Sequence, residues 1–225
     1  MTHVRLLTYN VLLGGRRGQP LHDVVRAVAP DVLMVNESPK APLLWHRRCR
    51  RLAQQCGLRY VAGGRPAGSN MIAVAAGIAV KSSAATVLPT PFGQPRRGVV
   101  TAQLRVAGRL LGVVGVHLSL DRDQRLVEIR RALELAHGLR GPVVLAGDLN
   151  EPPDGPSWAV LRRAGFVDHG DHGWATFPSD HPDRRIDALL VRGDATVLHH
   201  GDPMVDTGLL AAASDHRPVL AELEL

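Results

Sequence analysis

The chain has 225 residues, of which 45% are hydrophobic, so it is long enough to bury a sizeable core. Its formal net charge of +6 is compatible with nucleic acid, a membrane surface or a phosphorylated metabolite as an anionic partner. Only two of its 27 basic residues are lysines, a skew that GC-rich coding explains equally well. We find neither a signal peptide nor an apolar run long enough to cross a membrane. We therefore expect a cytoplasmic, monomeric protein with a single domain over residues 1–225.

The hydrophobic pattern predicts strands and helices along the whole chain. In chain order, the first half shows a strand at 4–12, a helix at 21–28, a strand at 31–36, a helix at 45–56 and a strand at 71–80. The second half shows strands at 99–106 and 110–117, a helix at 126–136, and strands at 143–147, 186–191 and 219–225. Several strands follow one another in the middle of the chain, which fits a purely alternating doubly wound sheet poorly. We expect two stacked mixed sheets with helices outside.

Polar side chains stand where three predicted strands end. Asn10 lies near the end of the first strand, Glu37 closes the run from Val32 to Asn36, and His117 closes the strand at 110–117. Strand ends hold side chains rigidly, so these three residues are candidates for a common cleft.

The sharpest local motif is the fully apolar strand that leads into Gly147-Asp148-Leu149-Asn150. If this segment is extended, Asp148 and Asn150 lie two residues apart on one face. Considered singly, Asp148 is equally well explained as a turn or helix cap, and Asn150 before Glu151 as turn chemistry.

A second motif, Ser214-Asp215-His216, leads into the final predicted strand, and Asp187 begins the strand about thirty residues upstream. An Asp can hold one imidazole nitrogen and direct the other towards a substrate. For His216 alone, a surface or structural histidine is the better interpretation, because the chain has 11 histidines. Only the combination with the other polar residues reverses that preference.

Together, these residues comprise one Glu, three Asp, two Asn and two His at strand ends. The oxygen donors suit an octahedral cation, which favours Mg²⁺, with Mn²⁺ as an alternative. Zn²⁺ is less favoured, because the pattern offers neither cysteine ligands nor a tight pair of histidines. The imidazoles suit phosphate binding or proton transfer.

The order and spacing of these elements resemble the endonuclease/exonuclease/phosphatase superfamily over essentially the whole chain. This resemblance implies a four-layered α/β sandwich, with two facing mixed β-sheets flanked by helices and a site where their strand ends meet. The matching pieces are Thr8-Tyr9-Asn10-Val11, Asp31 to Glu37, Ser69-Asn70-Met71-Ile72, Arg97-Gly98, His117-Leu118, Gly147-Asp148-Leu149-Asn150, Arg185-Ile186-Asp187 and Ser214-Asp215-His216.

The resemblance also implies a role for each residue. Glu37, with Asn10 beside it and Asp215 nearby, would bind the metal. Asp148 would orient or deprotonate the attacking water, with Asn150 as a hydrogen-bond donor. Asp187 would orient His216, and His216 and His117 would stabilise the phosphorus centre.

Two departures from the family pattern concern the substrate contacts. Asn36 stands where the family more often has glutamine, and Asn70 is followed by Met71-Ile72-Ala73-Val74-Ala75 rather than by a strand ending in Ser-Arg. Neither removes a metal ligand. We take Asn70, Arg97 and Trp174 as candidate substrate-binding residues, with solvated surface as the alternative for Arg97 and loop packing as the alternative for Trp174.

We therefore expect a Mg²⁺-dependent phosphoester hydrolase, either a phosphodiesterase or a phosphatase. Small phosphorylated molecules, lipid headgroups and nucleic acid all remain candidate substrates, and a DNA or RNA nuclease is the specific alternative. A non-catalytic nucleic-acid-binding module is the alternative from a different class, and it predicts broken metal ligands, of which the sequence shows none.

Overall fold

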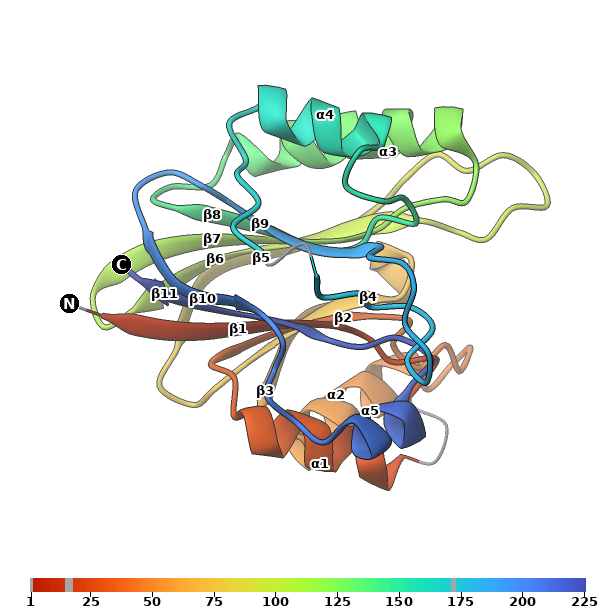
Figure 1. Ribbon diagram of the computed structural model, residues 1–225. Coiled ribbons are helices and arrows are strands. Elements are labelled where there is room, and N and C mark those ends of the chain that lie inside the picture. The colour runs from red at the N-terminus through yellow and green to blue at the C-terminus, as the bar shows by residue number, and fades with distance from the viewer. Residues whose placement is uncertain (1, 15–17, 171–172) are drawn as a thin grey trace.

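The structure, a computed structural model, describes residues 2–14, 18–170 and 173–225. Two β-sheets pack face to face, and helices cover the outer face of each sheet, so the fold has four layers (Figure 1). The predicted α/β sandwich with two facing mixed sheets is confirmed.

The first sheet has six strands in the order β10-β11-β1-β2-β4-β3. β1 and β2 run parallel, and the other four neighbouring pairs run antiparallel. The strands are β1 (His3–Asn10), β2 (Val32–Asn36), β3 (Arg59–Gly64), β4 (Asn70–Val74), β10 (Thr196–Gly201) and β11 (Val219–Glu224).

The second sheet has five strands in the order β5-β6-β7-β8-β9. β7 and β8 run parallel, and the other three pairs run antiparallel. The strands are β5 (Ala79–Val87), β6 (Gly98–Val106), β7 (Arg109–His117), β8 (Val143–Asp148) and β9 (Asp187–Arg192).

Five α-helices form the outer layers (Figure 1). α1 (Gln19–Val28), α2 (Trp45–Gln55) and α5 (Thr207–Ala213) cover the six-stranded sheet, and α3 (Arg122–Ala136) and α4 (Pro156–Arg163) cover the other. A short 3₁₀ helix, η1 (Arg65–Ala67), precedes β4. Side-chain caps begin two of the helices: Asp121 accepts from Gln124 N before α3, and Asp206 accepts from Leu209 N before α5. None of the described helices is long and apolar enough to span a bilayer.

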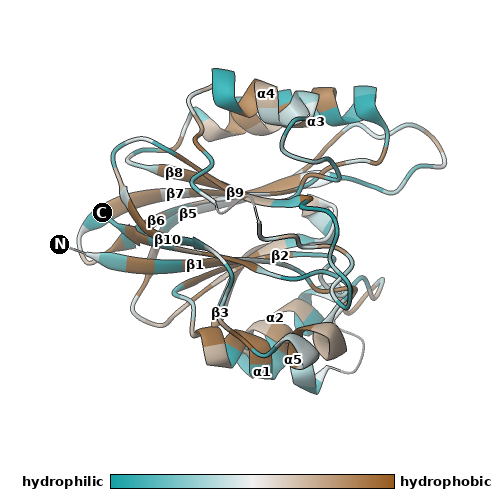
Figure 2. Ribbon diagram, in the orientation of Figure 1, coloured by the Kyte–Doolittle hydropathy of each residue, from teal (hydrophilic) through white to brown (hydrophobic). Residues whose placement is uncertain are grey.

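The core consists of one apolar layer between the sheets and one under each set of helices. Successive residues of a strand point to opposite faces, so Leu6 packs between the sheets and Leu7 packs under the helices. Both faces of the central strands are thus covered, which explains why the strands read as continuous hydrophobic runs rather than as alternating ones. Figure 2 shows the hydrophobic colouring concentrated on the strands and the adjoining helix faces.

The prediction of one strand at 71–80 is wrong. Residues 70–74 form β4 in the six-stranded sheet, and the chain then turns near Gly77 and enters β5 in the other sheet. The two strands share small apolar residues on both sides of the turn, so the pattern shows no break. The sequence analysis also missed β3, most of β5, β10, α4 and α5.

Candidate active site

The polar strand ends predicted from the sequence lie at one edge of the two sheets. In the six-stranded sheet, Asn10 pairs in register with Asn36 across the parallel strands β1 and β2. In the five-stranded sheet, Asp148 at the end of β8 pairs with His117 on one side and with Asp187 on the other. Register therefore places these side chains at the same level.

Asp148 lies at the centre of this group and is 1% exposed. Its Oδ2 atom accepts a hydrogen bond from Asn10 Nδ2 at 3.1 Å. The same oxygen lies 3.4 Å from His117 Nε2 and 3.8 Å from His216 Nε2. Asp148 thus joins residues from both sheets and from the loop before β11.

Asp187 and His216 form a buried pair. His216 Nδ1 lies 2.8 Å from Asp187 Oδ2, so the other ring nitrogen is directed towards Asp148 and Asn10. Thr176 fixes Asp187 in turn, because its hydroxyl oxygen accepts hydrogen bonds from the backbone N–H groups of Ile186 and Asp187. The ring of Phe177 packs beside His216 at 4.7 Å between centroids.

Glu37 and Asp215 are half-buried and lie in loops next to this cluster. Glu37 directly follows β2 and has a φ of 53°, a left-handed conformation that is strained for this residue type. Its carboxylate forms no hydrogen bond or ion pair with the described part of the chain. The single hydroxyl proton of Ser214 faces two acceptors, Asn10 O at 2.7 Å and Asp215 Oδ1 at 3.3 Å, and the shorter contact is the stronger hydrogen bond.

Asn150 forms hydrogen bonds at the ends of two neighbouring strands, β8 and β7. Its backbone N–H donates to Asp148 Oδ1 at 2.8 Å, and its side-chain amide donates to Leu118 O at 2.8 Å. Asn150 has a φ of 51°, so β8 ends at Asp148 and the chain is not extended as far as Asn150.

The pKa values of both central residues are raised, for different reasons. Burial and the charge of Asp187 raise the pKa of Asp148 to about 7, against the opposing effect of His216. Burial alone would lower the pKa of His216, but the charges of Asp187, Asp148 and Asp215 outweigh it and raise the pKa to about 9. At neutral pH, His216 is therefore an imidazolium beside two carboxyl groups.

Two basic residues face the same cluster from the five-stranded sheet. Burial, followed by the positive charges of Arg97, His216 and Lys40, lowers the pKa of His117 well below its usual range, so His117 is neutral. Arg97 is 8% exposed, and its buried Nε has no hydrogen-bond partner among the described residues. Burial lowers the pKa of Arg97, while the nearby carboxylates of Glu128, Asp148 and Glu37 oppose that shift.

Asn36 joins the two sheets beneath the cluster, a role that the sequence analysis missed. Its side-chain amide donates to Val116 O at 2.7 Å and to Asn70 Oδ1 at 2.8 Å, and its oxygen accepts from Asp148 N at 2.9 Å. Close approach at this point requires Gly147, because a Cβ atom there would lie 1.8 Å from Val116 O. The only signal in the sequence was an amide at the end of a buried strand.

Two buried glutamates also escaped the sequence analysis, because they lie on a helix and in a loop. Glu128 on α3 accepts hydrogen bonds from the backbone and hydroxyl of Ser119, two residues after His117. Glu151 accepts from Arg125 Nε at 3.0 Å and from Ser157 N at the start of α4. These contacts fix the loops that follow His117 and Asn150.

The three predicted substrate-binding residues lie in different surroundings. Arg97 faces the cluster, as described above. Asn70 is fully buried, and its amide donates to Gly98 O at 2.8 Å and accepts from Asn36. Trp174 is half-buried, donates to Pro218 O at 3.1 Å and packs against the core.

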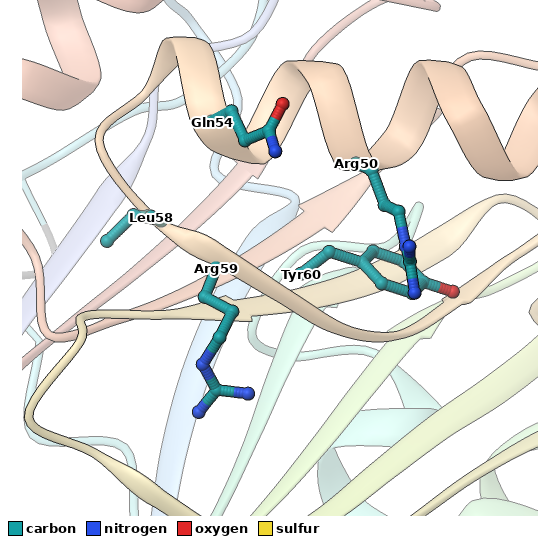
Figure 3. Close-up of a pocket in the computed structure, with 5 residues that line it drawn as sticks. All are labelled: Arg50, Gln54, Leu58, Arg59 and Tyr60. Atoms are coloured by element: carbon teal, nitrogen blue, oxygen red, sulfur yellow. The ribbon is translucent and has the colours of Figure 1, made fainter.

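A separate hollow of about 410 Å³ lies between α2 and β3 (Figure 3). It is lined by Arg50, Gln54, Leu58, Arg59 and Tyr60, and Figure 3 shows Arg50 reaching from the helix towards Tyr60 on the strand. No carboxylate or imidazole lines it, so it lacks the groups that the strand-end cluster brings together.

Comparison with known proteins identifies the family. The sequence model of the Endonuclease/Exonuclease/phosphatase family matches residues 7–216, which span every strand-end residue described above. The chain belongs to this family. No curated protein sequence matches it significantly. The resemblance inferred from the strand-end motifs is thus confirmed.

Solved structures show the same fold. An endonuclease/exonuclease/phosphatase from Beutenbergia cavernae is 23% identical with a TM-score of 0.75, over 100% of this chain and 72% of that one. A Bacteroides thetaiotaomicron mannosyl-6-phosphatase is 17% identical with a TM-score of 0.78, over 99% and 100%. D. rerio TDP2, complexed with single strand DNA product, is 17% identical with a TM-score of 0.70, over 100% of both chains. At these identities the likeness establishes the fold alone.

Proposed function

We propose that this family member hydrolyses a phosphoester with the help of a divalent cation, and that Asp148 activates the attacking water. The observation that carries the proposal is the convergence on Asp148 Oδ2 of Asn10, His117 and His216, at 3.1, 3.4 and 3.8 Å. A carboxylate held among an amide and two imidazoles can orient a water molecule and accept its proton.

The cluster fits a hard cation in its chemistry and its charge. The buried Oδ1 atom of Asp187 lacks a hydrogen-bond partner among the described residues. The half-buried carboxylate of Glu37 directly follows β2. Burial and the charge of Asp187 raise the pKa of Asp148, so a cation beside these two carboxylates would stabilise their charged forms. Oxygen-rich, acidic groups of this kind are what Mg²⁺ and Mn²⁺ bind.

We assign the cation to Glu37, with Asn10 and Asp215 beside it. Asp148, Asp187 and His216 also offer ligand atoms within 4.8 Å of one another. We leave His216 out of the ligand set, because Asp187 Oδ2 already engages its Nδ1 at 2.8 Å and a hard cation prefers oxygen ligands to imidazole. A cation at Glu37 would neutralise charge on the phosphoryl and leaving oxygens.

The charge of each remaining residue suits a different role in the reaction. The pKa of about 7 for Asp148 is well matched to a general base at neutral pH. Asn150, bonded to Asp148, has one amide hydrogen left to donate to the nucleophile or to a phosphoryl oxygen. The imidazolium of His216, held by Asp187, stabilises negative charge on the phosphoryl group, and neutral His117 binds beside it.

The substrate is a phosphorylated molecule. The similar structures include a mannosyl-6-phosphatase and a protein complexed with a single strand DNA product, so both small molecules and nucleic acid stay candidates. The charge of Arg97 suits a phosphate, whereas Asn70 is engaged within the protein, so of these two Arg97 is the better candidate for substrate contact. A cytoplasmic location and a monomeric state stay predictions.

A substrate screen separates this proposal from a non-catalytic binding module. Plasmid DNA, short RNA, abasic duplex, nucleotides, inositol phosphates, sugar phosphates and sphingomyelin would be incubated with Mg²⁺, Mn²⁺ or EDTA. We expect product release from at least one class with a metal, and none with EDTA. Salt-sensitive binding of DNA or RNA without product in any condition would instead identify a binding module.

A further inference from the structure

A basic hollow of about 300 Å³ lies beside the strand-end cluster. Three segments that are distant in the sequence form it: the loop after β2, the turn from η1 into β4, and the loop between β5 and β6. Its lining residues are Lys40, Arg65, Gly68, Ser69, Pro95 and Arg96.

The charge in this hollow is unbalanced. Lys40, Arg65 and Arg96 are exposed cations, and no acidic side chain lines the hollow with them. None of the three forms an ion pair or a side-chain hydrogen bond within residues 2–14, 18–170 and 173–225. Three unpaired cations around one concavity repel one another and attract an anion, and a phosphate group can accept several charge-assisted hydrogen bonds from them.

The backbone beneath these cations is fixed by close packing. A Cβ atom on Gly68 would lie 2.5 Å from Arg97 C, and one on Gly98 would lie 2.5 Å from Ala67 C, so glycine is required at both positions. Ser69 has a φ of 75°, and its carbonyl accepts a hydrogen bond from Ser38 N at 2.9 Å. The loop that carries Arg96 is therefore held against the turn that carries Gly68.

The hollow adjoins the proposed catalytic residues on two sides. Arg96 precedes Arg97, the buried guanidinium that faces Asp148 and Glu37 and has an unpartnered Nε. Lys40 follows Glu37 by three residues, and its charge contributes to the lowered pKa of His117. An anion in the hollow and a phosphoester at the strand ends can thus belong to one molecule.

We propose that this hollow is a second phosphate subsite, so that the substrate carries a non-reacting phosphate in addition to the phosphoester that is cleaved. The inference rests on the proposed function, because it concerns the substrate of the same site. The second phosphate can come from a small bisphosphorylated molecule or from the next phosphate along a nucleic-acid strand. The chemistry recognised is the same in both cases.

The kinetic test compares substrates that differ by one phosphate. Thymidine 5′-(p-nitrophenyl phosphate), with and without a 3′-phosphate, would be assayed with Mg²⁺ for the wild type, Arg65→Ala/Arg96→Ala, and Arg47→Ala/Arg50→Ala. The last variant removes two exposed arginines from α2 and controls for total charge. We expect the wild type to prefer the 3′-phosphorylated substrate about tenfold in kcat/KM, with this preference lost in Arg65→Ala/Arg96→Ala and kept in the control. The same ratio of kcat/KM values for the two substrates in all three proteins, whatever its size, would overturn the proposal.

A binding measurement keeps the subsite testable if turnover is absent. Calorimetry on Asp148→Asn, with and without the two arginine substitutions, would compare thymidine 3′,5′-bisphosphate and inositol 1,4-bisphosphate with the corresponding monophosphates and with oligothymidylate. A preference for a second phosphate that needs Arg65 and Arg96 supports the subsite, and the preferred scaffold identifies its source. Equal affinity for monophosphates and bisphosphates would refute the subsite, whereas binding without turnover in the wild type would refute the proposed hydrolysis alone.

Discussion

The pair formed by Asp187 and His216 offers a sharp test, because one conservative substitution removes a charge without changing the shape. In Asp187→Asn, the carboxylate 2.8 Å from His216 Nδ1 becomes an amide. The side chain at residue 187 is 1% exposed, so water cannot replace the lost charge. The substitution therefore acts on the protonation and orientation of His216, and it also lowers the pKa of Asp148, which the charge of Asp187 raises.

The size of the effect follows from the pKa of His216. Asp187 contributes most to raising it from 6.5 to about 9, against the opposing effect of burial. This interval corresponds to about 3 kcal/mol of preference for the imidazolium. Without Asp187, burial favours the neutral ring at pH 7.5, and the transition state loses a positive charge. A barrier raised by about 3 kcal/mol lowers kcat/KM by about 100-fold.

The assay combines kinetics with a direct view of the histidine. We would measure kcat/KM with Mg²⁺ on the best substrate from the screen, and titrate the His216 ring by NMR, with the resonance assigned from His216→Gln. Asp194→Asn, the same change on the exposed surface, is the matched control, and thermal unfolding checks that each variant folds. If Asp187→Asn keeps its kcat/KM within twofold and His216 stays protonated above pH 8, the assigned role of the pair is wrong.

Three further predictions concern stability. The pKa of Asp148 is raised from 3.8 to about 7, so the folded state loses stability as pH rises through this interval. Asp148→Asn should therefore be more stable than the wild type at pH 8 in EDTA, by up to about 4 kcal/mol in urea unfolding. A less stable variant would contradict this. Burial lowers the pKa of His200 from 6.5 to about 4. Between pH 7 and pH 4, the free energy of unfolding should therefore fall on the order of 3 kcal/mol more in the wild type than in His200→Phe. An equal fall in the two proteins would show that His200 does not control acid unfolding. Gly147→Ala should destabilise the fold by at least about 3 kcal/mol, because its Cβ would lie 1.8 Å from Val116 O. The control Gly138→Ala, whose Cβ would meet nothing within 4 Å, should be close to neutral. Equal melting temperatures for the two variants would disprove the packing argument.

The strand ends were predictable because each one combines two signals. A continuous apolar run such as Val143 to Ala146 indicates a strand covered on both faces, and the first polar residue after it must emerge at an edge. Asp148 and His117 follow this rule, whereas Glu37 is the second polar residue after its run, behind the buried Asn36. The order of several such ends along the chain then carried the family resemblance.

Other elements gave no comparable signal. β5 is an exposed edge strand made largely of Ala, Ser and Thr, so it has neither a buried run nor a clear alternation. α4 and α5 have 8 and 7 residues, too few for helical spacing to stand out.

The contacts that assemble the site could not be predicted from local sequence. Asn36 bonds Val116 and Asp148, which lie 80 and 112 residues away along the chain. Such bonds depend on how the two sheets meet, and this depends on packing across the whole core. The same holds for Glu128, which lies on the buried face of α3 with Ala132 and whose partner Ser119 belongs to the loop before the helix.

In the proposed mechanism, Asp148 and a divalent cation together cleave a phosphoester. The most direct measurement is turnover by the wild type and Asp148→Asn side by side, first with Mg²⁺, then with excess EDTA, then with Mg²⁺ restored. We predict that EDTA abolishes wild-type turnover, that Mg²⁺ restores it, and that Asp148→Asn is at least about 1,000-fold slower than the wild type whenever Mg²⁺ is present. Turnover by Asp148→Asn at the wild-type rate, or wild-type turnover that persists in EDTA, would contradict the mechanism.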